Sequence, residues 1–250
     1  MQYISTERRD QALWITFNRP AKLNVLHAAD LAGLRAAIED PGPGVRALVF
    51  AGAGSRAFSA GLNVEAFTGL DPAGAHALIS DLAAVMQAIR CSPLVSIAAI
   101  QGYCLGGAFE LALACDLRVA TADASFGLPE IKVGVPSVID AALLPAFVGL
   151  SKAREMILTG DLYRLDELPP GSIANVVAES AGLVAATRAL LGRTAAHTPT
   201  VTAAQRRLFG QWLATPVSAA IEASKAEFAG VFAAAETLDQ IDRHYRRITG

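Results

Sequence analysis

One stretch of this sequence restricts the fold more than any other, because it is almost wholly apolar yet contains two glycine turns and one carboxylate. It spans residues 97–113 and reads IAAIQGYCLGGAFELAL. The apolar run Leu94–Ile100 predicts a buried strand, and Gly106–Cys115 predicts a buried helix that follows a tight turn. Glu110 then lies on an apolar helix, where a carboxylate must find a partner, border a cleft or accept a raised pKa.

A membrane-spanning helix is the competing interpretation of these letters. Residues Leu94–Ala114 approach the length of a span and contain a G-x-x-x-G pair at Gly102 and Gly106. A carboxylate inside a span is unfavourable, and Gln101 and Gly102 interrupt the run. We therefore expect a strand and a helix inside a protein core, and no membrane association.

Composition favours a globular protein that acts on small molecules. The chain has 250 residues, of which 53% are hydrophobic and 18% charged, and its formal net charge is -2. This balance gives no electrostatic basis for binding nucleic acid or an anionic membrane. The length suits one large domain with a smaller appendage.

The chain alternates strand and helix patterns up to about residue 195. The predicted elements are a hairpin of Gln2–Glu7 and Gln11–Phe17, a helix Ala28–Glu39, a strand Val45–Phe50, a helix from Pro72 to about Arg90, and a strand Leu117–Ala120. Such alternation predicts an α/β fold of parallel units covered by helices.

Only helix patterns follow, at Thr200–Phe209, Pro216–Phe232 and Thr237–Arg247. We expect a core domain over residues 1–195 and a C-terminal helical region over residues 196–250.

Three further features point to a site at the ends of the strands. A helix that begins at Gly106-Gly107 directs unpaired N–H groups outward, although a tight turn for packing explains the same glycines. A second acid, Glu130, ends the segment FGLPE, and the loop FSAGL at 58–62 follows the strand Val45–Phe50. Two acids and exposed amides in one apolar pocket could polarise a carbonyl and move protons.

Other chemistries find little support. The spacing Gly52-x-Gly54-x-x-Ala57 resembles a dinucleotide fingerprint, but no long helix follows it. Serine-hydrolase, zinc-protease and P-loop motifs are missing, and no metal site is predicted. The cysteines Cys91, Cys104 and Cys115 lack C-x-x-C spacing and predict buried free thiols in a reducing compartment. With no secretory signal pattern, we expect a cytoplasmic protein.

The ordered set of motifs resembles the crotonase superfamily, the enoyl-CoA hydratase/isomerase family. The resemblance covers about residues 10–165 and is carried by the segments FNRP with Leu23-Asn24, AFSAG at 57–61, Gly102–Asp116, FGLPE at 126–130 and LTG at 158–160. It implies a crotonase-like spiral of ββα units with a C-terminal helical trimerisation region. It also implies a homotrimer or a hexamer made of two trimers, acyl-CoA substrates, and no cofactor beyond the coenzyme A of the substrate.

The resemblance also assigns roles to residues. Glu110 and Glu130 correspond to the two catalytic acids of the hydratases, and the N–H groups of Ala60 and Gly107 to the oxyanion hole. The expected substrate- and CoA-binding positions are Lys22, Leu23, Asn24, Ala57, Phe58, Ser59, Gly61, Leu62, Gly106, Pro129, Ser137 and Asp140.

Two acids favour hydration of 2-enoyl-CoA to 3-hydroxyacyl-CoA. The alternatives are an enoyl-CoA isomerase or another crotonase reaction, and a non-catalytic acyl-CoA-binding subunit. The segment PSVID at 136–140 replaces a glycine-rich stretch, so Asp140 is either a third acid facing the pocket or a residue that starts a helix.

Overall fold

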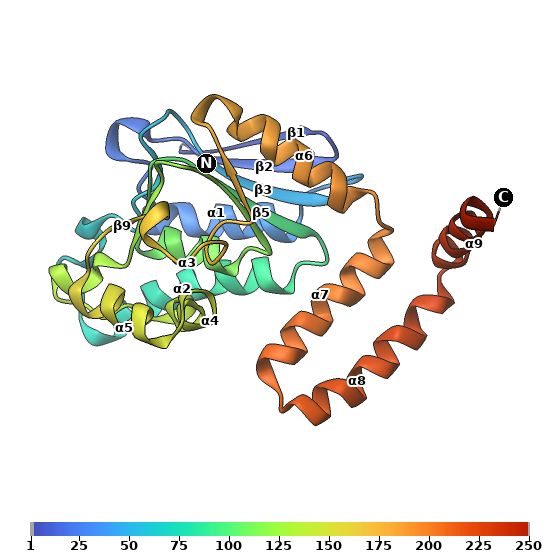
Figure 1. The fold of residues 1–250 in the computed structure, drawn as a ribbon. Coiled ribbons are helices and arrows are strands. Elements are labelled where there is room, and N and C mark those ends of the chain that lie inside the picture. Colours follow the sequence, from blue (N-terminus) through green and yellow to red (C-terminus); the bar gives the residue numbers. More distant parts are fainter. Residues whose placement is uncertain (1–2, 250) are drawn as a thin grey trace.

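A six-stranded sheet lies at the centre of the protein's main body in this computed structural model, which describes residues 3–249 (Figure 1). The strand order is β1-β2-β3-β5-β7-β10, with β1 and β2 antiparallel and the other neighbours parallel. The strands are β1 (Ile4–Arg9), β2 (Ala12–Phe17), β3 (Ala47–Gly52), β5 (Val95–Ile100), β7 (Leu117–Thr121) and β10 (Val176–Ala178).

A smaller four-stranded sheet collects the short strands that follow the long ones. It has the order β4-β6-β8-β9 and consists of β4 (Ala57–Ser59), β6 (Tyr103–Leu105), β8 (Ser125–Gly127) and β9 (Tyr163–Arg164). Because β4 follows β3, β6 follows β5 and β8 follows β7, each of these three long strands is followed by a short one before the next helical segment. This repeat is the predicted spiral of ββα units.

Helices cover both faces of the large sheet, with α6 (Leu183–Ala195) on one face and α1 (Ala28–Glu39), α2 (Pro72–Cys91) and α3 (Gly107–Ala114) on the other. The further helices are α4 (Leu144–Val148), α5 (Leu150–Thr159), α7 (Pro199–Ala214), α8 (Val217–Gly230) and α9 (Ala235–Thr249). The 3-10 helices nearest the site are η1 (Pro20–Lys22), η2 (Val64–Phe67), η3 (Pro129–Val133) and η4 (Ile139–Leu143).

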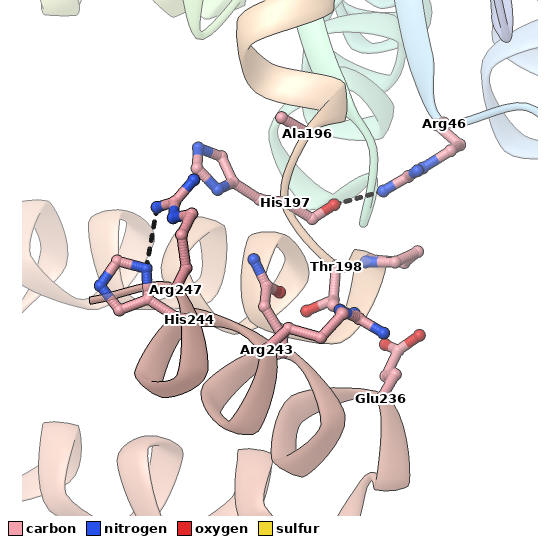
Figure 2. Close-up of a pocket in the computed structure, with 10 residues that line it drawn as sticks. Arg46, Ala196, His197, Thr198, Glu236, Arg243, His244 and Arg247 are labelled. Atoms are coloured by element: carbon pink, nitrogen blue, oxygen red, sulfur yellow. Dashed lines mark hydrogen bonds between the residues drawn. The ribbon is translucent and has the colours of Figure 1, made fainter. Parts of the chain in front are cut away.

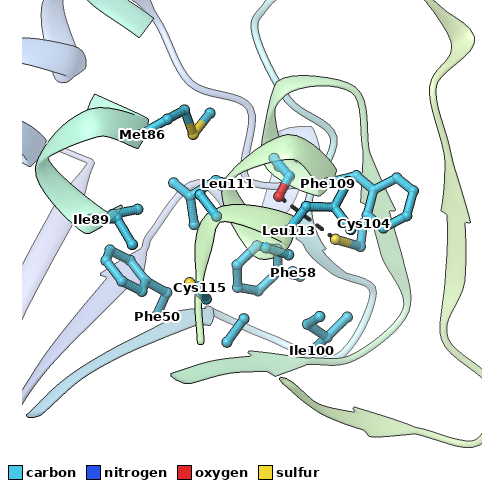
Figure 3. Packing of buried hydrophobic residues seen from close by; sticks show 14 of the residues in the cluster. Phe50, Phe58, Met86, Ile89, Ile100, Cys104, Phe109, Leu111, Leu113 and Cys115 are labelled. Carbon is cyan, nitrogen blue, oxygen red and sulfur yellow. Dashed lines mark hydrogen bonds between the residues drawn. The ribbon is translucent and has the colours of Figure 1, made fainter. Parts of the chain in front are cut away.

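Alternation along the strands divides the core in two. Ile97 and Ala99 of β5 belong to the cluster beneath α6, whereas Ala98 and Ile100 belong to the larger cluster on the opposite face. Figure 3 shows part of this larger cluster, in which side chains from β3, β5 and α2 surround the apolar residues of α3. The helix that carries Glu110 is therefore held on several sides by a packed core.

Most predicted elements are confirmed. The helix Ala28–Glu39 has the predicted bounds, and the hairpin turns at Asp10 and Gln11, which both have positive φ. Asp71 caps α2 by accepting a hydrogen bond from the Gly74 N–H at 2.7 Å. The short strands were not predicted, because three residues carry no usable periodicity.

One prediction about the cysteines is wrong. Cys104 and Cys115 are buried free thiols, but Cys91 is exposed. It is the last residue of α2, where the helix has passed the edge of the core.

The C-terminal helices α7, α8 and α9 extend away from the body (Figure 1). A cavity of about 490 Å³ lies where α9 approaches the end of α6, and we call it the basic cavity. Figure 2 shows Arg46 donating to the His197 carbonyl there, and Arg243 and Arg247 reaching in from α9. Within residues 3–249 no helix combines the length and hydropathy needed to cross a bilayer.

A buried arginine ties the end of α3 to the rest of the fold. Arg118 of β7 donates from Nε to the Ile173 carbonyl at 2.6 Å, and from Nη1 to the carbonyls of Ala112 at 3.1 Å and Cys115 at 2.8 Å. A cation at a helix C-terminus is favourable, because the last carbonyls lack helical partners. Arg118 thereby holds the helix that positions Glu110.

We predict that Arg118→Met lowers the free energy of unfolding by about 3–5 kcal/mol, because three buried carbonyls lose their donor. Thermal unfolding followed by circular dichroism measures this as a fall in Tm. Arg188→Met is the matched control, since Arg188 is exposed and pairs with Asp10 at the surface. It should change the free energy by less than about 1 kcal/mol, and equal losses in the two variants would contradict the assigned role of Arg118.

Candidate active site

Glu110 and Glu130 line one cavity of about 330 Å³, which we call the acid cavity. Glu110 comes from the first turn of α3 and Glu130 from η3, so two separate ββα units supply the two acids. The rest of the lining is mostly apolar and includes side chains from η2 and α2. The structure thus brings together the two acids that are twenty positions apart in sequence.

Glu110 is the more deeply buried acid, with 2% of its surface exposed. Its Oε2 accepts a hydrogen bond from the Asp140 N–H at 3.1 Å. Burial, and then the nearby carboxylates of Glu130 and Asp140, raise the pKa of Glu110 to about 8, against the lowering effect of the backbone amides of Ala141 and Asp140. Glu110 can therefore hold or release a proton near neutral pH.

Glu130 is less buried and has its own donor. The Ser137 hydroxyl donates to Glu130 Oε2 at 3.0 Å, and burial raises the pKa of this carboxyl above its usual range. The carboxylate lies directly against Gly106, where a Cβ would sit 2.7 Å from Glu130 Oε1. Gly106 has φ 56° and ψ -136°, a conformation reserved for glycine, so both its backbone and its missing side chain serve the site.

The two predicted oxyanion amides lie in adjacent segments. A Cβ on Gly61 would sit 3.0 Å from the Gly107 nitrogen, so the chain after Ala60 packs backbone to backbone against the start of α3. Gly107 N–H is the first amide of the helix and has no hydrogen-bond partner among the described residues. Ala60 N–H, in contrast, donates to the Leu23 carbonyl at 2.9 Å.

The structure gives the other predicted positions in the 57–62 loop different surroundings. Ala60 and Leu62 line the acid cavity, whereas Ala57, Phe58, Ser59 and Gly61 are buried outside its lining. The Phe58 ring packs edge-on against Phe17 at 5.2 Å, and the Ser59 hydroxyl accepts from the Gly61 N–H at 3.1 Å. Any contact of Phe58 or Ser59 with a ligand would therefore use the backbone.

The predicted segment 22–24 adjoins this loop. Leu23 and Asn24 have positive φ values of 52° and 55°, which turn the Leu23 carbonyl toward Ala60. The Asn24 amide donates to the carbonyls of Ala53 at 2.9 Å and Ala57 at 2.8 Å. This buried side chain thus fixes the loop, while Lys22 remains exposed at the end of η1.

The remaining predicted positions lie around the acids. Pro129, like Gly106, lines the acid cavity, and Ser137 contacts Glu130. Asp140 falls in the first turn of η4 and does not line the cavity. Its buried carboxylate forms an ion pair with Arg90, which favours the helix-start interpretation over a third acid facing the pocket.

Sequence reasoning missed the apolar wall of the cavity. Ala75, Ile79 and Leu82 share one apolar face of the predicted helix that begins at Pro72, which indicates core packing, and all three also border the cavity. Further lining residues not predicted are Val64, Phe67, Lys132, Val133, Val135, Pro136, Val138 and Ile139. Only the helical spacing around Ile79 offered a signal, because loop residues carry no pattern that specifies which cavity they line.

The basic cavity does not offer comparable chemistry. Arg46, Arg243 and Arg247 line it together with a single carboxylate, Glu236, which accepts from the Thr200 N–H at 3.1 Å (Figure 2). A larger cavity of about 960 Å³ lies between α7 and the body and is mainly apolar. The acid cavity alone, among these three, combines two carboxyls with a free backbone amide.

Comparison with known proteins agrees with this geometry. The chain is 29% identical over 193 residues to a crotonyl-CoA hydratase of Syntrophomonas wolfei, covering 76% of this chain and 74% of that protein. It is 32% identical to the (E)-benzylidenesuccinyl-CoA hydratase of Thauera aromatica, covering 71% of each chain. The crystal structure of an enoyl-CoA hydratase from Mycobacterium smegmatis matches with a TM-score of 0.91 and 26% identity, covering 98% of this chain and 96% of that one.

These likenesses extend beyond the core. The family model for enoyl-CoA hydratase/isomerase matches residues 7–244, which include the strands, the acid cavity and most of the C-terminal helices. The chain therefore has the crotonase fold and belongs to the enoyl-CoA hydratase/isomerase family.

Proposed function

We propose that this protein hydrates 2-enoyl-CoA thioesters to 3-hydroxyacyl-CoA. The observation that carries the proposal is the convergence of Glu110 and Glu130 on one apolar cavity beside the free Gly107 amide. Family membership and relatives named as hydratases support the same reaction. A protein that only binds acyl-CoA would have no need for two buried acids with raised pKa values.

The two acids would divide the proton transfers. Ionised Glu110 accepts a proton from a water molecule as its oxygen bonds to Cβ, and protonated Glu130 donates a proton to Cα. Two carboxyls in one dry cavity rarely ionise together, so the resting pair carries one shared proton. Because the reaction requires the pair to carry one proton, we expect the hydration rate to fall as pH rises through the pKa of about 8, where that proton is lost.

The backbone would stabilise the enolate that forms on attack. Gly107 N–H is unoccupied, and Ala60 N–H would share its hydrogen between the thioester oxygen and the Leu23 carbonyl. An oxyanion donor of this kind is worth about 3 kcal/mol of transition-state stabilisation. The acyl chain would lie along the apolar wall formed by α2, η2 and the 133–139 segment.

Membership of the family supports a binding site for coenzyme A and assembly into an oligomer. The ADP part of coenzyme A would lie along segments 22–24 and 54–62, mostly on backbone groups, and no separate cofactor takes part. We also propose a homotrimer, alone or paired into a hexamer, in the cytoplasm, where the free thiols of Cys104 and Cys115 would stay reduced.

Replacing either acid should nearly abolish turnover. We predict that Glu110→Gln and Glu130→Gln each reduce kcat for crotonyl-CoA hydration at least ~100-fold, because each removes one proton-transfer group but keeps the side-chain shape. Loss of the enone-thioester ultraviolet absorbance measures the rate, and mass analysis identifies the added water.

Glu39→Gln is the matched control, since Glu39 is exposed at the end of α1, where it pairs with Arg35. It should retain wild-type activity. Full activity in the Glu110 variant would instead indicate single-acid chemistry such as double-bond isomerisation, and no turnover with any enoyl chain length would remove the hydratase proposal.

Burial of Glu110 should also make the stability of the folded protein depend on pH. Its pKa is about 8 in the folded state against about 4.5 for an ordinary glutamate, so the folded protein holds the proton more tightly and loses stability as pH rises from about 4.5 to 8. Glu110→Gln avoids this loss. We predict a Tm several degrees above wild type at pH 9 and a much smaller difference at pH 5, measured by scanning calorimetry; a lower Tm at pH 9 would contradict it.

The C-terminal helices should mediate assembly. They carry exposed apolar side chains, including Leu213 at 75%, Val217 at 74% and Phe228 at 69% exposure. We predict a mass of three or six times the 26.0 kDa chain by multi-angle light scattering, and a shift to smaller species in Phe228→Asp. A monodisperse monomer of the wild-type protein would contradict the trimer.

A further inference from the structure

An ion pair with a buried carboxylate end lies next to Glu110. The Asp140 carboxylate, 4% exposed, pairs with the Arg90 guanidinium, 38% exposed, at the end of α2. The backbone N–H of the same Asp140 donates to Glu110 Oε2 at 3.1 Å. Asp140 thus touches Glu110 through its amide, while its side chain faces away from the acid cavity toward Arg90.

The turn that presents this amide is strained. Ile139, the residue before Asp140, has φ 40°, although a branched Cβ makes the left-handed region unfavourable. Such strain persists only where the surrounding structure imposes it, and it gathers at functional sites. The Arg90 pair and the Glu110 hydrogen bond are two contacts that fix the turn at Asp140.

The Arg90–Asp140 pair also places charges near Glu110, so it can affect the ionisation of Glu110 as well as the structure. Glu110 lines the same cavity as Glu130 of η3 and accepts the amide of Asp140 on η4, so three carboxyls lie close together. Arg90 on α2 is the cation that an ion pair joins to this group. Lys132, which lines the cavity, instead pairs with Asp161 at 2.8 Å.

We propose that Arg90 and Asp140 are positioning residues, which orient the Glu110 carboxylate and set how readily it releases its proton during hydration. The inference rests on the proposed function for its catalytic consequence, but the pair itself acts on Glu110 whether or not substrate is turned over. Neither residue lines the acid cavity, so neither touches the substrate.

The two charges act on Glu110 with opposite sign. Removing the Asp140 charge leaves Arg90 unopposed and favours ionised Glu110. Removing the Arg90 charge leaves Asp140 unopposed and favours protonated Glu110. A tie that served stability alone would not produce shifts in opposite directions.

The test is a four-member cycle of wild type, Asp140→Asn, Arg90→Met and the double variant, with hydration of crotonyl-CoA measured against pH. We expect the basic limb of kcat, where the shared proton is lost, to move down by about one pH unit in Asp140→Asn and up by about one in Arg90→Met. Well above the limb, this makes Asp140→Asn about ten-fold slower relative to its own maximum than wild type is. The double variant, in which both charges are gone, should return close to the wild-type limb.

A second measurement tests the effect of Arg90 and Asp140 on Glu110 without the hydration reaction. The side-chain carboxyl carbon of Glu110, labelled with ¹³C and assigned by its loss in Glu110→Gln, reports the titration without substrate. Arg90→Lys keeps the charge and should titrate like wild type. If hydration is undetectable but the pKa of Glu110 falls in Asp140→Asn and rises in Arg90→Met, the proposed function is wrong and the positioning role of the two residues is supported. If the pKa moves in the same direction in both variants, or in neither, the positioning role is wrong.

Discussion

The interaction between two carboxyls in one apolar cavity, Glu110 and Glu130, is the constraint on which the rest of the site depends. Burial disfavours the ionised form of each acid, and ionisation of one disfavours ionisation of the other. Opposing this, Glu110 lies in the first turn of α3, where the helix dipole favours negative charge, and it accepts the Asp140 amide. The balance leaves a proton that can move near neutral pH, which is the property that hydration of a conjugated thioester requires.

The fold creates this environment for the two acids by packing backbone segments closely against one another. The ββα repeat gathers the short strands β4, β6 and β8 into one sheet, so the loops that follow them meet at the acid cavity. Gly61 and Gly106 allow approaches that a Cβ would block, one against Gly107 and the other against Glu130. Arg118 then anchors the far end of α3, so the short helix is fixed at both ends.

The sequence predicted most of this arrangement, and its omissions have physical causes. Long apolar runs and caps such as Asp71 specified the main helices and strands, because their periodicity is independent of tertiary contacts. The glycine turn before Glu110 indicated an active site, since an acid in an apolar helix needs an explanation. The partners of Asp140 and of the Ala60 amide could not be predicted, because Arg90 lies 50 residues from Asp140 and the acceptor for Ala60 is a backbone carbonyl.

The bond between Ala60 N–H and the Leu23 carbonyl has a consequence for how the empty protein meets its ligand. An amide aimed at a dry pocket would otherwise wait without an acceptor, which is unfavourable in a folded interior. In the proposed reaction the Leu23 carbonyl is the acceptor of this amide until a thioester arrives, after which the amide would serve both oxygens and the Gly107 amide would gain a hydrogen bond. Segment 22–24 and the Ala60 loop are joined by this hydrogen bond, so a ligand that shifted the Leu23 carbonyl would also change the geometry at the Ala60 amide.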